Sequence, residues 1–451
     1  MNIQSFLEFE KQSKIDEILI EGDIPLWRIC RRSVRIKYLR IVNKTTNPEI
    51  NYIYILFNIV ISFFQLLYLI LFVKKDYVFF PHSRLYKIDG QYIDKLSDPI
   101  IDSVPQIKES YCILQNPQNG RQNYPRYHNK NAYNLDFVVA ISILFSAIFK
   151  KYYSKKYSAE ILQVLNIIHP DNNEIAAYRD IIVCDVANFF ITYKLYSIIL
   201  HALSPKAIFV IPREVFSSAV VYCRRHGIKT MEIEHGITMT ENELYSGLYN
   251  ETYDVDYFLT FGQASNDTCF GMPLDKVRNI GFAYKHWLFE RIPQNKKSSD
   301  KIILILSEPH ITDRIVQTTI ELALTYKDYF FCIRCHPQET LSKEHINSIS
   351  LYSNILIADN KQESLYSFYL YDAIIGENSS SVYEALSIGK RVGRLNYNGF
   401  KSININPIIY SGKVLNSIGD FMQLMTDDPV VTKTHTAYSD FNQELLLNLM
   451  L

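Results

Sequence analysis

The chain has 451 residues, 48% of them hydrophobic, and its 47 lysines and arginines balance its 47 aspartates and glutamates. That length suits two domains of roughly 200 residues each, and the zero net charge gives the whole protein no electrostatic reason to bind nucleic acid. The seven cysteines are scattered and odd in number, which argues against a disulfide framework and favours a reducing compartment.

The first strongly apolar segment covers residues 52–73 and carries no charge. About 20 apolar residues are enough to cross the hydrocarbon core of a bilayer. Arginines and lysines precede the segment, and Lys74 and Lys75 follow it, so the positive-inside rule favours neither orientation. Three interpretations stay open: a helix on or re-entering an anionic membrane surface, a helix buried in the core, and a true membrane span.

A second apolar run, residues 137–149, is again followed by lysines, Lys150 and Lys151. Two such segments in one half of the chain favour contact with a membrane surface. Residues 1–14 are largely polar and contain no apolar signal region. We therefore expect a cytoplasmic protein that associates peripherally with the inner membrane.

Beyond residue 75, short β-rich runs alternate with helical stretches, which is typical of parallel sheets covered by helices on both faces. Strands are predicted at residues 76–81, 111–114, 207–212, 230–234 and 257–260, with helices at 180–203 and 217–226. After a polar linker at 294–300, strands are predicted at 301–306, 329–334, 355–358, 373–375 and 391–395, with helices at 311–326 and 381–388. The sequence therefore predicts an α/β fold of two Rossmann-like, doubly wound domains, residues 1–290 and 291–451, facing one another across a cleft.

The most informative motif is IIGENSSSVYEALSIGK at residues 374–390, an apolar strand that runs into three serines and an apolar-periodic helix. Serine hydroxyls at a helix start lie beside unpaired backbone N–H groups and the positive end of the helix dipole, so they can hold a phosphate. The predicted ligands are Ser379, Ser380 and Ser381. Glu384 keeps two interpretations: the partner of Ser381 in a capping box, or an acceptor for ribose or sugar hydroxyls.

A second motif, Glu232-Ile233-Glu234-His235-Gly236, ends a predicted strand. His235 titrates near neutrality, and Glu234 either orients it or takes the proton itself, while Gly236 lets the backbone turn or approach a ligand. The alternative is that Glu232 and Glu234 share one strand face and His235 caps a loop. The motif predicts a general base that faces the cleft.

A third motif, Arg334-Cys335-His336-Pro337, also ends a strand. Pro337 fixes the exit of the chain and holds His336 at the rim of the sheet, where its imidazole can contact a phosphate or cap a turn. Arg334 can reach the same anion or extend into solvent. Further candidates at the ends of strands are Gly262, Ser307 and Glu308.

Several common motifs are missing from the sequence: the P-loop, G-x-G-x-x-G and H-E-x-x-H. Their absence argues against P-loop kinases, dinucleotide-dependent dehydrogenases and metalloproteases. Asp254-Val255-Asp256 spells D-x-D but enters a strand instead of leaving one, which disfavours a metal-dependent transferase. Cys332 and Cys335 have C-x-x-C spacing within a buried-strand pattern, which favours core packing over a zinc or redox role.

Together, E-H-G at the end of one strand, H-P at the end of another and G-E-N-S-S-S-x-x-E-A-L-x-I-G-K resemble bacterial surface-polysaccharide glycosyltransferases of the two-Rossmann (GT-B) type. The families most similar in pattern are polysialyltransferases, capsule Kdo transferases and teichoic-acid glycerophosphotransferases. The resemblance covers residues 205–396 in order and spacing, and earlier residues only in general layout. It implies an inverting, metal-independent transfer from a CMP-sugar or UDP-sugar to a lipid-linked or growing cell-surface glycan, in capsule or lipopolysaccharide O-antigen biosynthesis.

The resemblance also implies roles for particular residues. Residues 1–290 would form the acceptor side with its membrane-associating helices, and residues 291–451 the nucleotide-sugar side. Glu234 or His235 would be the base, a choice left open because polysialyltransferases have two acidic residues before the glycine. His336 and the serines would bind the donor phosphate, with no metal or other cofactor. The alternatives are a CDP-alditol glycerophosphotransferase and a non-catalytic glycan-assembly scaffold.

Overall fold

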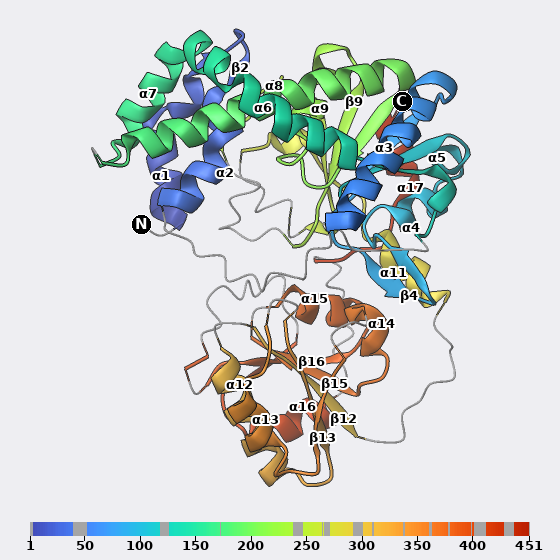
Figure 1. Ribbon diagram of the computed structural model, residues 1–451. Coiled ribbons are helices and arrows are strands. Elements are labelled where there is room, and N and C mark those ends of the chain that lie inside the picture. Colours follow the sequence, from blue (N-terminus) through green and yellow to red (C-terminus); the bar gives the residue numbers. More distant parts are fainter. Residues whose placement is uncertain are drawn as a thin grey trace.

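The computed structural model describes residues 3–38, 52–117, 126–171, 173–237, 247–263, 265, 271–291, 301–308, 311–336, 339–359, 363–377, 379–397, 399–400, 412–427 and 437–450. These residues form two larger β-sheets in which every strand pairing is parallel. Figure 1 shows the two halves of the chain one above the other, with helices on both. The predicted α/β fold with two doubly wound units facing each other is confirmed.

The first sheet has the strand order β11-β10-β9-β8-β3-β6-β7. Its strands are β3 (Tyr77–Phe80), β6 (Tyr111–Gln115), β7 (Ala132–Asn134), β8 (Ala207–Val210), β9 (Lys229–Ile233), β10 (Tyr257–Thr260) and β11 (Val277–Asn279). The chain builds outward from β3 to one edge and then returns to the other side of β3. Such a switch point opens a crevice at the carboxyl ends of the strands, where ligands bind in this class of sheet.

Both faces of this sheet are buried, which explains why its central strands are continuously apolar. On one face, Phe79 stacks on Phe209 with ring centroids 4.5 Å apart, among residues of α4 (Asp98–Ser103) and α5 (Pro105–Glu109). On the other face, Val78 and Phe80 pack in the cluster that also holds residues of α3 (Tyr52–Phe72), α8 (Ile175–Leu203) and α9 (Ser217–Arg225). The sheet is therefore the middle layer of this half.

The second sheet has the order β14-β13-β12-β15-β16-β17, with a switch point between β12 and β15. Its elements are β12 (Ile302–Leu306), α12 (Thr312–Thr325), β13 (Phe330–Arg334), α13 (Lys343–Ile349), β14 (Ile355–Ile357), α14 (Ser364–Phe368), β15 (Ala373–Gly376), α15 (Ser380–Ser387), β16 (Arg391–Leu395), β17 (Lys413–Leu415) and α16 (Asp420–Thr426). Ile303 and Ile305 point to the cluster that includes residues of α12 and α16, whereas Leu304 and Leu306 belong to the cluster shared with the first sheet.

The end of the chain returns to the first half. Residues 437–450, including α17 (Gln443–Met450), lie against strands β10 and β11: the Ser439 N–H donates to the Phe261 carbonyl at 2.8 Å and the Asn442 N–H to the Ile280 carbonyl at 2.7 Å. Gly281 permits this contact, because a Cβ there would stand 2.0 Å from the Asp440 carbonyl oxygen. Figure 1 shows α17, in red, beside the helices of the first half. The sequence assigned these residues to the second domain.

A helical lobe precedes and flanks the first sheet. It contains α1 (Ile3–Ser13), the short strands β1 (Leu19–Ile20) and β2 (Ile24–Pro25), α2 (Leu26–Tyr38), α6 (Asp136–Lys156) and α7 (Ser158–Ile168). A second small antiparallel pair, β4 (Tyr86–Ile88) and β5 (Gln91–Ile93), follows β3, and α11 (Ala283–Phe289) follows β11. Strand β4 lies on the side of the first half that faces the second (Figure 1).

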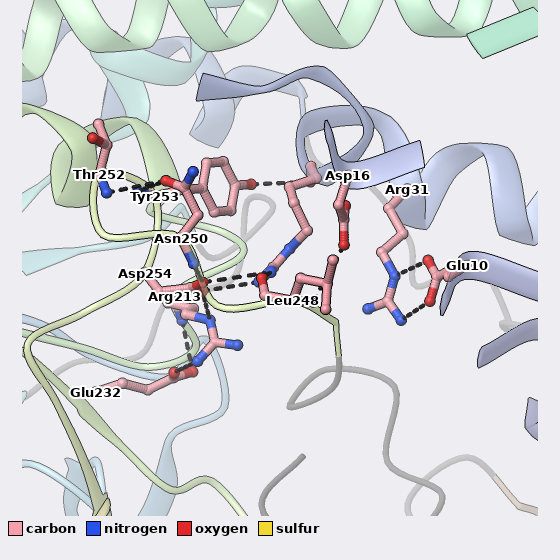
Figure 2. A network of polar contacts seen from close by, with 11 residues as sticks. Glu10, Asp16, Arg31, Arg213, Glu232, Leu248, Asn250, Thr252, Tyr253 and Asp254 are labelled. Carbon is pink, nitrogen blue, oxygen red and sulfur yellow. Dashed lines mark hydrogen bonds and ion pairs between the residues drawn. The ribbon is translucent and has the colours of Figure 1, made fainter. Parts of the chain in front are cut away.

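Buried ion pairs fasten the lobe to the sheet (Figure 2). Asp254 accepts from Arg28 at 2.9 Å and lies 3.1 Å from the Arg213 guanidinium, which also reaches Glu232 at 3.0 Å. Asp256 pairs with Arg224 and accepts from the Thr230 N–H. Both acidic residues of the D-x-D sequence are therefore occupied by structural contacts. These contacts give both carboxylates a structural role.

Candidate functional site

A cavity of about 330 Å³ lies where the carboxyl ends of the two sheets face each other. Its walls come from both halves of the chain. The first half contributes His82, Arg84, Tyr86, Asp94, Lys95, Leu96, His235, Gly236, Phe261 and Phe282. The second contributes Leu306, Ser307, Arg334, Cys335, His336, Ser364, Ser379, Ser380, Ser381 and Glu384, and the returning C-terminal segment adds Tyr438.

Most of the residues predicted from the sequence meet in this cavity. Those that line it are His235, Gly236, Ser307, Arg334, His336, Ser379, Ser380, Ser381 and Glu384. Glu234, Gly262 and Glu308 do not line it, and Pro337 lies outside the described residues. The structure thus brings together three motifs that lie far apart in the sequence, between residues 235 and 384. They meet because each follows a parallel strand.

Two histidines form the first wall. The His235 ring lies parallel to the His82 ring, with centroids 5.8 Å apart and 10° between the planes. The Arg84 N–H donates to His82 Nδ1 at 3.1 Å, so a neutral His82 carries its proton on Nε2. Burial and, to a smaller extent, the charge of Arg84 lower the pKa of His235 to about 4. Burial, followed by the charges of His235 and Arg84, lowers the pKa of His82 to about 4 as well. Both imidazoles are neutral at pH 7, so His235 is in the form that accepts a proton.

These two imidazoles should make the stability of the protein depend on pH. Their folded-state pKa values of about 4 lie below the ordinary histidine value of 6.5, so protons bind preferentially to the unfolded chain. The free energy of unfolding is therefore expected to fall as the pH drops from about 6.5 to 4, by on the order of 3 kcal/mol per imidazole, and to be unaffected by them above pH 7. Urea unfolding across this pH range measures the effect. The His82→Asn/His235→Asn variant should lose most of this dependence, and an unchanged slope would contradict the assignment.

Glu234 is placed differently from the prediction. Its side chain is fully buried, and its two oxygens accept from the Phe261 N–H at 2.8 Å and from the Ser265 hydroxyl at 2.5 Å. These bonds hold the loop after β10 against the end of β9. Glu234 does not line the cavity, whereas His235 does. The sequence could not separate the two, since both stand at the same strand end.

The serine segment forms the opposite wall. Ser379 is the N-cap of α15, and its side chain accepts from the Ser381 N–H at 3.3 Å. Ser380 and Ser381 are the first two residues of the helix, so their N–H groups and hydroxyls lie at the positive end of its dipole. Because Ser379 is the cap, the capping-box interpretation of Glu384 with Ser381 is wrong.

The loop after β13 is organised by a residue that the sequence analysis missed. Glu339 accepts from the His336 N–H at 3.0 Å and from the Ser307 hydroxyl at 2.7 Å. These bonds join the ends of β13 and β12. Burial and the charge of Arg84 lower the pKa of His336. Arg334 is buried and donates to the Ser367 hydroxyl at 2.7 Å. The alternative that its side chain extends into solvent is therefore wrong.

A lysine whose side chain is 14% exposed links the two halves across the cavity. Lys95, which follows β5, lies 2.7 Å from Glu384 Oε1 and 3.7 Å from Glu363 Oε1. Tyr284 donates to the other oxygen of Glu363 at 2.8 Å. Burial alone would lower the pKa of Lys95, but the carboxylates of Glu384 and Glu363 raise it instead. Glu384 Oε2 is buried and accepts no hydrogen bond within the described residues, and Glu384 is one of the residues that line the cavity.

The balance of charge in the cavity favours an anion. The cavity lining contains three basic residues, Arg84, Lys95 and Arg334, and two acidic residues, Asp94 and Glu384. Burial, with the nearby Asp98, raises the pKa of Asp94 to about 6, so this carboxyl loses its charge only below neutral pH. Among the described residues, no group of three or more histidines, cysteines, aspartates or glutamates has the arrangement of a metal site. The chemistry offered is anion binding beside a neutral imidazole.

Comparison with known proteins gives similarity in structure alone. The sequence matches no protein-family model and no curated protein sequence. Among solved structures, UDP-GlcNAc 2-epimerase from Neisseria meningitidis bound to UDP-GlcNAc aligns over 83% of this chain and 99% of its own, with 14% identity and a TM-score of 0.47. The Methanocaldococcus jannaschii UDP-GlcNAc 2-epimerase aligns over 83% of this chain and 98% of its own, with 11% identity and a TM-score of 0.49. The wall teichoic acid polymerase TagF aligns over 92% of this chain and 90% of its own, with 13% identity and a TM-score of 0.41.

Proposed function

We propose that this protein is a glycosyltransferase that moves a sugar from a nucleotide-activated donor to a hydroxyl acceptor. The observation that carries the proposal is the cavity between the two sheets, where His235 on one side faces His336 and the serine start of α15 on the other. A base and an anion site on opposite walls are what group transfer from a phosphate leaving group requires.

In the proposed reaction, the neutral imidazole of His235 removes the proton from the acceptor hydroxyl. The acceptor oxygen forms a bond to the anomeric carbon as the bond from that carbon to the phosphate oxygen breaks, which inverts the configuration. The electron pair leaves with the nucleotide phosphate. His336 and the N–H and hydroxyl groups of Ser379 and Ser380 stabilise that charge, and Glu384 accepts from a hydroxyl of the donor.

The positive charge for the leaving group would come from the protein. Arg84, Lys95 and Arg334 supply it in the cavity, and we propose that transfer needs no divalent metal or other cofactor. The second half would hold the nucleotide-sugar and the first half the acceptor. A CMP-sugar is the first candidate donor and a UDP-sugar the second.

The pattern resemblance gives the biological setting of the proposal. The acceptor would be a lipid-linked or growing cell-surface glycan, as in capsule or lipopolysaccharide O-antigen biosynthesis in a bacterium. The enzyme would work in the cytoplasm, at the inner face of the membrane. An acceptor carried by a lipid agrees with a first half that exposes apolar helices beside lysines.

Thermal denaturation with separate nucleotides tests the donor site. CMP or UDP at about 100 times its dissociation constant is expected to add roughly 3 kcal/mol to the free energy of unfolding, because it binds only the folded state. The matched control is the His336→Ala/Ser380→Ala variant, which should respond much less. If CMP, UDP and GDP all fail to raise the melting temperature at millimolar concentration, the proposal loses its main support.

Product analysis separates the proposed activity from its alternatives. Incubation with a matching donor and acceptor, with EDTA present, should release the nucleotide and add the mass of one sugar. Addition of a glycerol phosphate or ribitol phosphate from a CDP-alditol would identify a phosphotransferase instead. Nucleotide binding without turnover of any tested donor would support a non-catalytic scaffold.

A further inference from the structure

Helix α3 exposes an apolar face to the outside of the protein. Its inner side carries Ser62, Leu66 and Leu69, which are buried against the first half. Its outer side carries large apolar residues that are 38–81% exposed: Tyr52, Ile53, Tyr54, Leu56, Phe57, Val60, Phe63, Phe64, Leu67, Tyr68, Leu71 and Phe72. Soluble proteins rarely expose an apolar patch of this extent unless it contacts a partner or a membrane.

The neighbouring helix α6 continues this face. Phe63 of α3 and Phe137 of α6 pack with ring centroids 5.1 Å apart. The apolar residues that α6 exposes are Ile143, Leu144, Phe145, Ile148, Phe149 and Tyr152. Figure 1 shows α3 and α6 on the upper half, away from the second sheet. We call these exposed residues of the two helices the α3–α6 face.

The contacts of α3 decide how it meets a bilayer. By length and composition α3, α6 and α8 could each cross a membrane. However, the Ser62 hydroxyl donates to the Asn134 carbonyl at 2.5 Å, and the Asn134 N–H donates to Gln65 Oε1 at 2.9 Å. These bonds fasten the middle of α3 sideways to the end of β7. A helix held along one side by a folded domain presents only its other side to lipid, which favours lying in the interface over spanning.

A basic groove of about 700 Å³ lies at the end of this face. It is formed by the C-terminal part of α6 and the first turns of α7 and α8. Its charged residues are Lys150, Lys151, Lys155, Arg179 and Asp180. Asp180 pairs with Lys150, whereas Lys151, Lys155 and Arg179 form no ion pair with the described part of the chain. Lys151 follows Phe149 and Ile148 on the helix, so the unpaired cations stand where the apolar face ends.

We propose that the α3–α6 face lies in the surface of an anionic bilayer and that the groove between α6 and α8 binds the phosphate of a phospholipid headgroup. Apolar side chains enter the acyl region while lysines and an arginine beside them meet the headgroups, as in interfacial helices. The charges select an anionic leaflet, since the net charge of the whole chain is zero and cannot supply the attraction. This membrane site is separate from the cavity and does not depend on the proposed transferase activity.

Vesicle flotation with the full chain tests the groove. The protein should bind vesicles of phosphatidylcholine mixed with phosphatidylglycerol and bind pure phosphatidylcholine more weakly. The Lys151→Gln/Lys155→Gln variant should bind the anionic vesicles about 25-fold more weakly, since each surface cation contributes roughly a factor of five. The matched control Lys327→Gln/Lys343→Gln removes two exposed lysines from the second half and should bind as the parent does. Equal binding by the groove variant and the control would overturn the headgroup site.

A second variant tests the apolar face. Phe64→Ser/Leu71→Ser changes two residues that are 62% and 60% exposed, so its melting temperature should equal that of the parent. It is expected to lose binding to both kinds of vesicle by 10-fold or more, because two large apolar side chains no longer leave water for the acyl region. A parent protein that binds no vesicle, or that forms a dimer dissociated by these substitutions, would overturn the membrane assignment. Stabilisation by nucleotides tests the donor site separately, so failure of the membrane assignment and failure of the proposed transferase activity can be distinguished.

Discussion

Replacement of His235 by asparagine is expected to lower the rate of sugar transfer by about 10²–10⁴-fold, the usual contribution of general base catalysis. Asparagine keeps much of the size of the ring but cannot accept a proton at neutral pH. Stabilisation by the nucleotide should change little, since the anion site belongs to the second half. Steady-state kinetics should therefore show a loss in kcat with an almost unchanged KM for the donor.

His82 supplies the matched control for this experiment. It stacks on His235 and shares its low pKa, but its Nδ1 already accepts from the Arg84 N–H. The His82→Asn variant is expected to keep most of the activity, and Glu234→Gln to reduce stability more than kcat. If His82→Asn abolishes transfer while His235→Asn retains it, the base is His82 and the proposed role of His235 is wrong.

Replacement of Lys95 by methionine is expected to destabilise the protein by about 3–5 kcal/mol, as is usual when one partner of a buried ion pair is removed. The side chains of Lys95, Glu363 and Glu384 are 14%, 0% and 5% exposed. Without the lysine, the two carboxylates would remain buried beside each other. Urea unfolding at pH 7.5 measures the loss, and it should become smaller at lower pH, where the carboxylates can take up protons.

Two further variants make the Lys95 experiment specific. Glu384→Gln added to Lys95→Met should restore part of the lost stability, because it removes one of the buried carboxylates left without the lysine. Lys108→Met removes a lysine that is 57% exposed beside Asp102 and should change stability by less than about 1 kcal/mol. Equal effects of Lys95→Met and Lys108→Met would show that the link across the cavity contributes little.

The sequence by itself determined the fold class and nine of the residues that line the cavity. Buried parallel strands are continuous apolar runs, so β3, β8, β12 and β15 were visible as local patterns. The ends of such strands meet at one edge of a sheet, which is why the sequence alone predicts that His235, His336 and Ser379 lie together. The short strands β7 (AYN) and β17 (KVL) were not predicted, since they lack the uninterrupted apolar run by which β14 (ILI), of the same length, could be found.

Only the tertiary structure decided which of these residues face the cavity and what stands opposite them. Glu234 and His235 are neighbours in the chain, yet long-range bonds to Phe261 and Ser265 bury one of them and leave the other at the cavity wall. His82, Arg84 and Lys95 come from irregular segments around β4 and β5 with no recognisable motif, so no periodic signal marks them. The return of α17 to the first half and the packing of one side of α3 also depend on contacts between distant residues. Local periodicity encodes which strands and helices form, whereas side-chain direction at a site is fixed by partners far along the chain.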